Sequence, residues 1–80
     1  MYIAQEKRYE AIRAATDAKL QSRRTELDAL PLLERAQRLI DEAVSEFYDD
    51  QVAAYHDYEF IERIVWNLVS AADKPPPVHD

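Results

Sequence analysis

One histidine of this 80-residue chain stands among carboxylates, a combination of side chains that is able to bind a metal ion. His56 is preceded by Asp49 and Asp50 and followed by Asp57 and Glu59. The di-iron sites of helical bundles need a Glu-x-x-His pattern on facing helices, and an alanine stands three positions before His56. We therefore expect no metal site, and we interpret His56 as a surface histidine.

The other residue types give little support for catalysis. Ser22, Ser45 and Ser70 fall in segments that we expect to be helical, and neither histidine is placed by sequence to activate a serine. The chain has no cysteine, which excludes a thiolate nucleophile, a disulfide and a cysteine zinc site. It also has no glycine, which phosphate-binding loops need where the backbone approaches the phosphate. We expect neither an enzyme nor a cofactor.

Acidic and tyrosine residues are concentrated in the middle of the chain. The net charge is −6, and the stretch from Asp41 to Glu62 contains eight acids and no base. Aromatic rings among carboxylates suit protein binding, because rings supply buried area and charges steer the encounter. We predict that this stretch binds a basic protein partner. The candidate partner-binding residues are Glu42, Glu46, Tyr48, Asp49, Asp50, Tyr55, Asp57, Glu59, Glu62 and Trp66.

The alternative is that this acidic face is merely solvated and partly neutralised within the molecule. If the chain reverses near residues 30 and 31, Lys19 comes opposite Glu42 and Arg13 comes near Asp49. Exposed ion pairs of this kind contribute roughly 0–1 kcal/mol. In either case so negative a chain is a poor ligand for nucleic acid, which proteins bind by neutralising phosphates. We expect no direct nucleic-acid partner and no membrane partner.

The element that must organise these residues is the apolar segment from Tyr58 to Ala72. On a helical wheel its apolar residues cover a wider arc than one contact surface needs. We therefore expect this helix to be covered from two sides. Trp66 falls outside the arc, so it either packs against another element or lies exposed on a polar face.

The rest of the chain also favours helices. Without glycine, hairpin turns are disfavoured, and we predict an all-α fold. A first helix is predicted over residues 2–29, with a break possible between Ser22 and Thr25. Pro31 suits the first turn of a second helix over residues 31–48, which forms an antiparallel helical hairpin with the first.

The segment between Tyr48 and Asp57 allows two structures. Asp57 is able to cap a third helix over residues 57–72, which gives a three-helix bundle. Against a break, the apolar residues on both sides keep the seven-residue repeat of a coiled coil, which favours one continuous helix over residues 32–72. A single continuous helix leaves part of its apolar arc uncovered, so that the protein must then dimerise. A homodimer is our expectation, because so small a core yields only marginal stability.

Residues 1–73 are predicted to form a single domain. Residues 74–80 contain three consecutive prolines and are predicted to be a flexible tail, with Pro75 to Pro77 folded back over Trp66 as the alternative. No run of residues approaches the roughly 20 apolar positions of a membrane-spanning helix, and the first residues lack the apolar core of a signal peptide. We expect a cytoplasmic location.

These observations favour a small acidic regulator or inhibitor that binds a basic protein, such as a nucleic-acid-binding protein. Its size and charge are similar to those of anti-defence and antitoxin-like proteins of phages and mobile elements, although no family motif is matched. The alternative is a structural coiled-coil component of a larger assembly, and a small helical enzyme is the least favoured function.

Overall fold

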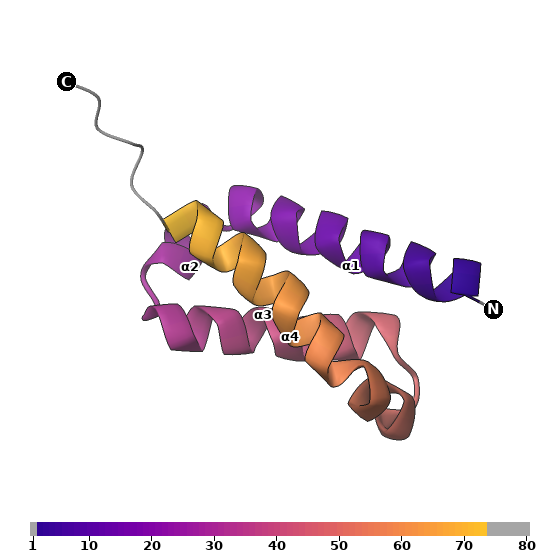
Figure 1. Ribbon diagram of the computed structural model, residues 1–80. Coiled ribbons are helices and arrows are strands. Elements are labelled where there is room, and N and C mark those ends of the chain that lie inside the picture. Colours follow the sequence, from indigo (N-terminus) through magenta and orange to yellow (C-terminus); the bar gives the residue numbers. More distant parts are fainter. Residues whose placement is uncertain (1, 74–80) are drawn as a thin grey trace.

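The computed structural model describes the backbone of residues 2–73 and the side chains of residues 6–73. Within that range the chain forms helices and no strand, which confirms the predicted all-α bundle (Figure 1). The predicted proline-rich tail and its contact with Trp66 lie outside the described residues. The four helices are α1 (Tyr2–Ser22), α2 (Arg24–Asp28), α3 (Leu32–Phe47) and α4 (Gln51–Asp73).

The first predicted helix, over residues 2–29, is divided in two by a bend at Arg23. The backbone of Arg23 has φ −114° and ψ 32°, outside the α-helical region. The backbone hydrogen bonds nevertheless continue through the bend, since the Arg23 amide donates to Lys19 and the Leu27 amide donates to Arg23. The bend turns α2 onto the core, where Leu27 is completely buried. The break foreseen between Ser22 and Thr25 is thus present without any proline.

The second helix begins where the sequence predicts a reversal. Pro31 has an extended ψ of 153°, and α3 starts at the next residue.

Arg35 lies on the inner side of α3 and is buried, with 7% of its surface exposed. Its guanidinium donates to the carbonyl oxygens of Leu27 and Leu30, both at 2.9 Å, and to the carboxylate of Asp73 at 3.1 Å. One side chain thereby joins the end of α2, the turn and the end of α4.

The alternative prediction of one continuous helix over residues 32–72 is wrong, because the chain leaves the helical conformation at Tyr48. That residue has φ −134° and ψ 131°, which is extended backbone. The start predicted at residue 57 for the last helix is also wrong, since α4 begins at Gln51. Asp50 is its N-cap, because its Oδ1 accepts a hydrogen bond from the Val52 amide at 2.9 Å. Asp57, the predicted cap, lies inside α4.

The apolar arc of α4 is covered on two sides, as the sequence predicts. Helix α4 packs against both α1 and α3 and crosses them obliquely (Figure 1). Ile61, Val65 and Val69 of α4 are fully buried, together with Ile12 of α1 and Ile40 of α3. A single chain therefore covers this helix without a second copy, although the expected homodimer stays a prediction.

The α1 helix has a largely polar exterior. Ile12 and Thr16 are its buried side chains among those described, while Tyr9 stacks on Phe60 of α4 at 5.4 Å between ring centroids. None of the helices within residues 2–73 is at once long enough and apolar enough to cross a membrane.

Candidate partner-binding site

Two of the predicted acids face α1 rather than a free surface. Lys19 binds Glu46 and lies 3.1 Å from Glu42, while Arg23 donates to Glu42 at 2.6 Å. The pairing of Lys19 with Glu42 that the sequence predicts is thus confirmed. Hydrogen bonds from Arg23 and then from Lys19 lower the pKa of Glu42 below its usual value. Both acids form ion pairs between α3 and α1. Their charges are therefore largely neutralised within the chain.

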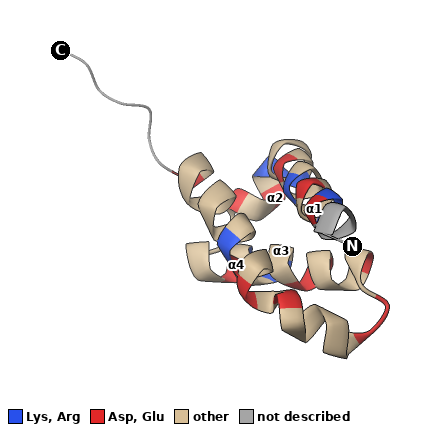
Figure 2. Ribbon diagram, turned by 45° about the vertical axis from the view of Figure 1, so that its right-hand side comes forward, with Lys and Arg blue, Asp and Glu red and all other residues tan. Residues whose placement is uncertain are grey.

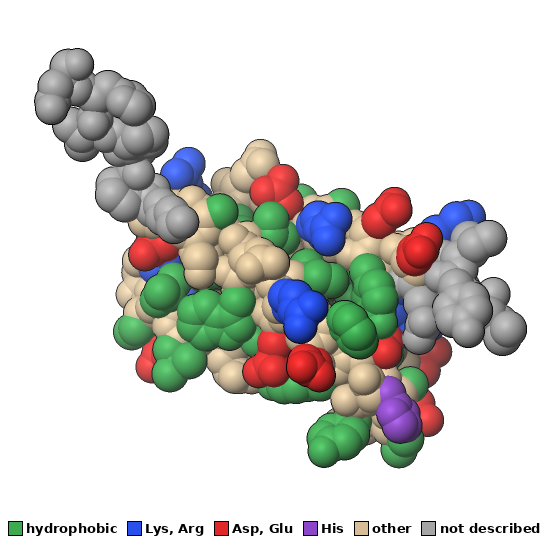
Figure 3. All heavy atoms as spheres, in the orientation of Figure 1, with side chains coloured by type: hydrophobic (Ala, Val, Ile, Leu, Met, Phe, Trp, Pro, Cys, Tyr) green, Lys and Arg blue, Asp and Glu red, His purple; other side chains and the backbone are tan. Residues whose placement is uncertain are grey.

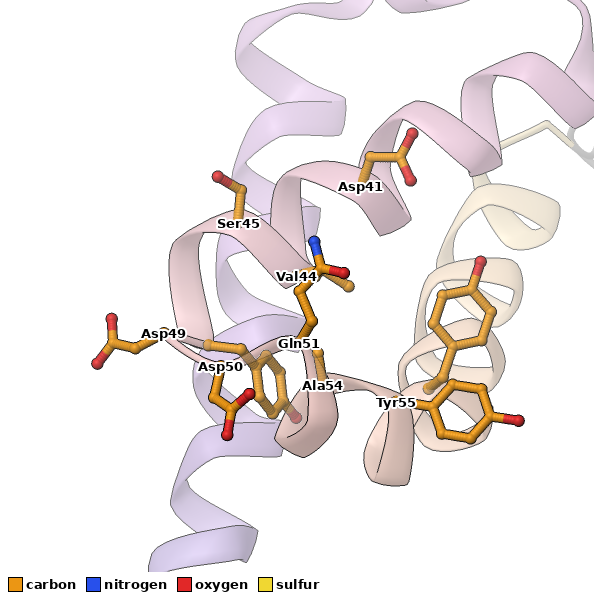
Figure 4. A pocket seen from close by; sticks show the side chains of 10 residues that line it. Asp41, Val44, Ser45, Asp49, Asp50, Gln51, Ala54 and Tyr55 are labelled. Atoms are coloured by element: carbon orange, nitrogen blue, oxygen red, sulfur yellow. The ribbon is translucent and has the colours of Figure 1, made fainter.

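The second predicted pairing, between Arg13 and Asp49, does not form. Arg13 lies beside Glu10, Asp17 and Leu68, on the side of α1 that faces α4. Asp49 stands in the loop between α3 and α4, where its carboxylate projects outward (Figure 4). The loop acid is therefore left exposed to solvent.

Tyr48 and Asp57 form a buried pair beneath the corner between α3 and α4. The Tyr48 hydroxyl donates to Asp57 Oδ2 at 2.7 Å, and only 8% and 7% of the two residues are exposed. Burial and then the hydrogen bond to Asp57 raise the pKa of Tyr48. Arg8 of α1 lies over the tyrosine ring, 4.8 Å from its centroid, with Nη1 3.9 Å from Asp57 Oδ2. This pair is a structural contact and is not a free binding surface.

An open groove lies next to this pair, between α3, the loop and the start of α4. Its volume is about 550 Å³. From α3 and the loop it is lined by Asp41, Val44, Ser45, Tyr48, Asp49 and Asp50. From α4 it is lined by Gln51, Ala54, Tyr55 and Tyr58. We call it the acidic-tyrosine groove.

The polar side chains of the groove differ in where they point. Figure 4 shows Asp41 and Ser45 on α3, Val44 and Gln51 toward the middle, and Tyr55 on the opposite wall. Gln37 donates to Asp41 Oδ1 at 3.1 Å and so fixes that carboxylate at one end. Tyr55 is 80% exposed, which leaves most of its ring open to a ligand.

The remaining predicted residues continue from the groove along α4. Tyr55, Glu59, Glu62 and Trp66 follow one another at spacings of four, three and four, which places them on one side of a helix. Glu59 is exposed, Glu62 is half-buried, and Trp66 is half-buried against the core. Trp66 is thus partly covered by the chain itself.

The structure therefore divides the ten predicted residues into two groups. Glu42, Glu46, Tyr48 and Asp57 are engaged in contacts within the chain, and Asp50 caps α4. No side-chain hydrogen bond or ion pair within the described residues engages the other five, of which Asp49, Tyr55 and Glu59 are exposed and Glu62 and Trp66 are half-buried. Figure 2 shows acidic segments around the corner between α3 and α4, while α1 carries acidic and basic segments together.

Sequence reasoning missed several residues that line the groove. Asp41 belongs to the acidic stretch but was not singled out, and Tyr58 was assigned only to the apolar arc. The available signal was their position on α3 and α4 near the Tyr48–Asp50 loop, which brings the two helices together. Gln51 was not predictable as a groove residue, because the last helix was expected to begin at residue 57 and not at Gln51.

No family model, curated protein or solved structure matched this chain. The fold and the groove define an all-α helical bundle with a concave acidic and aromatic surface at one corner.

Proposed function

We propose that this protein is a regulator or inhibitor that binds a basic protein through the acidic-tyrosine groove and the adjoining side of α4. The protein acts in the cytoplasm on a partner such as a nucleic-acid-binding protein, in the manner of anti-defence or antitoxin-like proteins. It is a binding function without catalysis, cofactor or direct contact with nucleic acid.

The observation that supports this proposal is a concave surface with carboxylates beside exposed tyrosine. The groove has Asp41 and Asp49 at its edges and Tyr55 on one wall. Tyrosine supplies large contact area with few rotatable bonds, and carboxylates attract a positively charged surface over a distance of about 10 Å at 0.1 M salt. Acids that pair with α1 do not contribute to this attraction, whereas those at the groove do.

The test begins with the tagged full chain, which is used to recover binding proteins from its native host. Each recovered protein is then purified, and its affinity is measured for the wild-type chain and for a double variant with Asp41→Lys and Asp49→Lys. A basic partner whose affinity for the wild-type chain falls with added salt, and whose affinity for the double variant is at least tenfold lower, supports the proposal. Asp50 is left unchanged, because its side chain caps α4.

A matched control separates the groove from overall charge. Asp17 is exposed on α1, away from the groove, and Asp17→Lys with Glu10→Lys makes the same change in net charge. We expect this second double variant to keep most of the affinity. Equal losses in the two double variants would show that only net charge matters, and the proposed binding site would then be rejected.

A second candidate function is a structural component of a larger assembly. It is favoured by exposed apolar residues, since Leu33 is 67% exposed and Val52 is 63% exposed. Figure 3 shows hydrophobic side chains gathered over the end of α4 and the start of α3. The apolar position Ile61 is fully buried within one chain and is not available for such a contact. Binding that weakens in Leu33→Ser and is indifferent to salt would favour this function.

A further inference from the structure

The acidic-tyrosine groove combines three kinds of surface in one hollow. Val44 supplies apolar atoms, Tyr55 and Tyr58 supply aromatic rings, and Asp41 supplies a negative charge. A ligand that matches all three has an aliphatic stem, a flat cationic end that stacks on a ring, and donors for a carboxylate. Among protein side chains this description fits arginine, because the lysine ammonium is a strongly hydrated point charge that does not stack.

The chain itself contains an arginine held in this way. The guanidinium of Arg8 lies over the ring of Tyr48 and beside the carboxylate of Asp57. By contrast, Lys19 lies among the carboxylates of Glu42 and Glu46. The pairing of tyrosine with aspartate is therefore already used by this fold to hold a guanidinium from α1. The groove presents the same two side-chain types on its open side.

A second hollow on α3 lacks this combination. It has a volume of about 530 Å³ and is lined by Glu34, Gln37, Arg38, Asp41, Glu42 and Ser45. It contains no aromatic ring and already includes a cation of its own. Negative charge alone thus does not distinguish the two hollows, whereas the tyrosine rings do.

We propose that the acidic-tyrosine groove is a receptor for a single arginine side chain of a partner protein. The stem lies on Val44, and the guanidinium stacks on Tyr55 or Tyr58 while it donates to Asp41. This inference rests on the proposed binding function and adds the chemical identity of the residue that is bound. Most of the discrimination comes from the rings, because an exposed carboxylate attracts lysine as well as arginine.

The test uses the 15N-labelled full chain and three small probes in NMR titrations. The probes are N-acetyl-arginine methylamide, N-acetyl-lysine methylamide and the neutral citrulline analogue of the first. We expect the arginine probe to shift amide signals of Ser45 and of residues 49–58 with a saturable, weak affinity. The lysine probe is expected to bind more weakly, by at most the roughly two- to fivefold that one exposed cation–π contact contributes, because its hydrated ammonium does not stack flat on a ring. The citrulline probe is expected to cause no saturable shift.

Variants locate the binding within the groove. Tyr55→Ala removes an exposed ring and is expected to weaken arginine binding roughly two- to fivefold, while Asp41→Asn is expected to weaken it by removing the charge. Asp17→Asn makes the same chemical change on α1 and is expected to have no effect. Amide signals from the core residues Ile12 and Val65, recorded in each variant, show that the fold is retained.

The two proposals fail in different ways. Equal affinity for arginine and lysine, shifts that map outside the groove, or no saturable shift would overturn the arginine inference, even if a basic partner still binds through Asp41 and Asp49. Conversely, a groove that selects arginine, in a protein whose partner is indifferent to Asp41→Lys and Asp49→Lys, would leave the arginine site in place and reject the proposed function.

Discussion

Tyr48 donates its hydroxyl hydrogen to a carboxylate that is almost hidden from solvent, and Arg8 closes this contact from the opposite helix. An isolated carboxylate is costly to bury, so the stability of this corner depends on both neighbours of Asp57. The acidic stretch was recognisable in the sequence as a region, but this burial was not predictable residue by residue. It follows from the reversal of the chain after Phe47, which brings Tyr48 and Asp57 together although they lie nine residues apart.

Removal of one hydroxyl group tests the contribution of this pair. Tyr48→Phe keeps the ring but leaves Asp57 without its 2.7 Å donor. We expect a loss of about 1–3 kcal/mol in the free energy of unfolding, because a buried acceptor is left unsatisfied. Urea unfolding followed by circular dichroism measures this loss. Tyr55→Phe makes the same change at an 80% exposed residue and is expected to be neutral. Similar losses in both variants would contradict the structural role of Tyr48.

At the scale of elements, the bends and turns determine what the helices present. The seven-residue apolar spacing continues from α3 into α4 even though the chain breaks between them, so this spacing alone does not reveal the break. Phe47 and Ala54 both contribute to the core on either side of it. The local signal was Asp49 and Asp50, which are weak helix formers, and the second of them is the cap. The sequence analysis predicted Asp57 as the cap instead, because this residue stands directly before the apolar arc.

The cap can be tested by substitutions at one position. Asp50→Ala removes the acceptor for the Val52 amide, and we expect a loss of about 0.5–2 kcal/mol in the free energy of unfolding. Asp50→Ser supplies another capping oxygen and is expected to recover most of this stability. Asp49→Ala alters the neighbouring loop acid and serves as the control. Thermal unfolding of the three variants provides the comparison, and the capping role would be refuted by a larger loss at Asp49 than at Asp50.

The contact between α2, α3 and α4 depends on the shape of one side chain. Arg35 is buried and reaches two backbone carbonyls and Asp73 with separate nitrogen atoms. Arg35→Lys keeps the charge but presents a single ammonium group, so it cannot reproduce this fork of donors. We expect a loss of about 1–3 kcal/mol in urea unfolding, from the acceptors left unpaired.

Arg38 offers a control for that substitution on the same helix. It is exposed, and its Nη1 lies 3.3 Å from Glu26. An exposed ion pair contributes about 0–1 kcal/mol, so Arg38→Lys is expected to have little effect. If the two lysine variants unfold at the same urea concentration, the geometry of Arg35 is not important for stability.

For the whole molecule, the bundle and its two-sided core were predictable because they depend on apolar periodicity and on Pro31. The contents of the groove were less predictable, because they depend on how far α3 and α4 diverge beyond the loop. The uneven charge has a similar explanation. The acids of α3 were expected either to face a partner or to be partly neutralised within the molecule, and Glu42 and Glu46 do complete an ionic contact with α1. Only acids beyond the reach of α1 are free to contribute to a binding surface.

These internal contacts predict a limited pH range of maximal stability. Hydrogen bonds from Arg23 and Lys19 lower the pKa of Glu42, whose ordinary value is 4.5. The folded state therefore binds this proton less readily than the unfolded chain, and stability decreases as the pH falls below about 4.5. Burial raises the pKa of Tyr48 above its ordinary value of 10.0, so the folded state keeps a proton that the unfolded chain loses. Stability then decreases as the pH rises above about 10.

The acid and alkaline limits can be assigned separately by thermal unfolding across pH. Glu42→Gln is expected to melt at a lower temperature at neutral pH and to lose less stability on acidification than the wild-type chain. Tyr48→Phe is expected to show a shallower decrease above pH 10. Part of that decrease remains, because hydrogen bonds to Glu46 and Glu42 raise the pKa of Lys19 despite the opposing effect of its burial. Wild-type and variant curves that stay parallel at both limits would show that these side chains do not set the pH range.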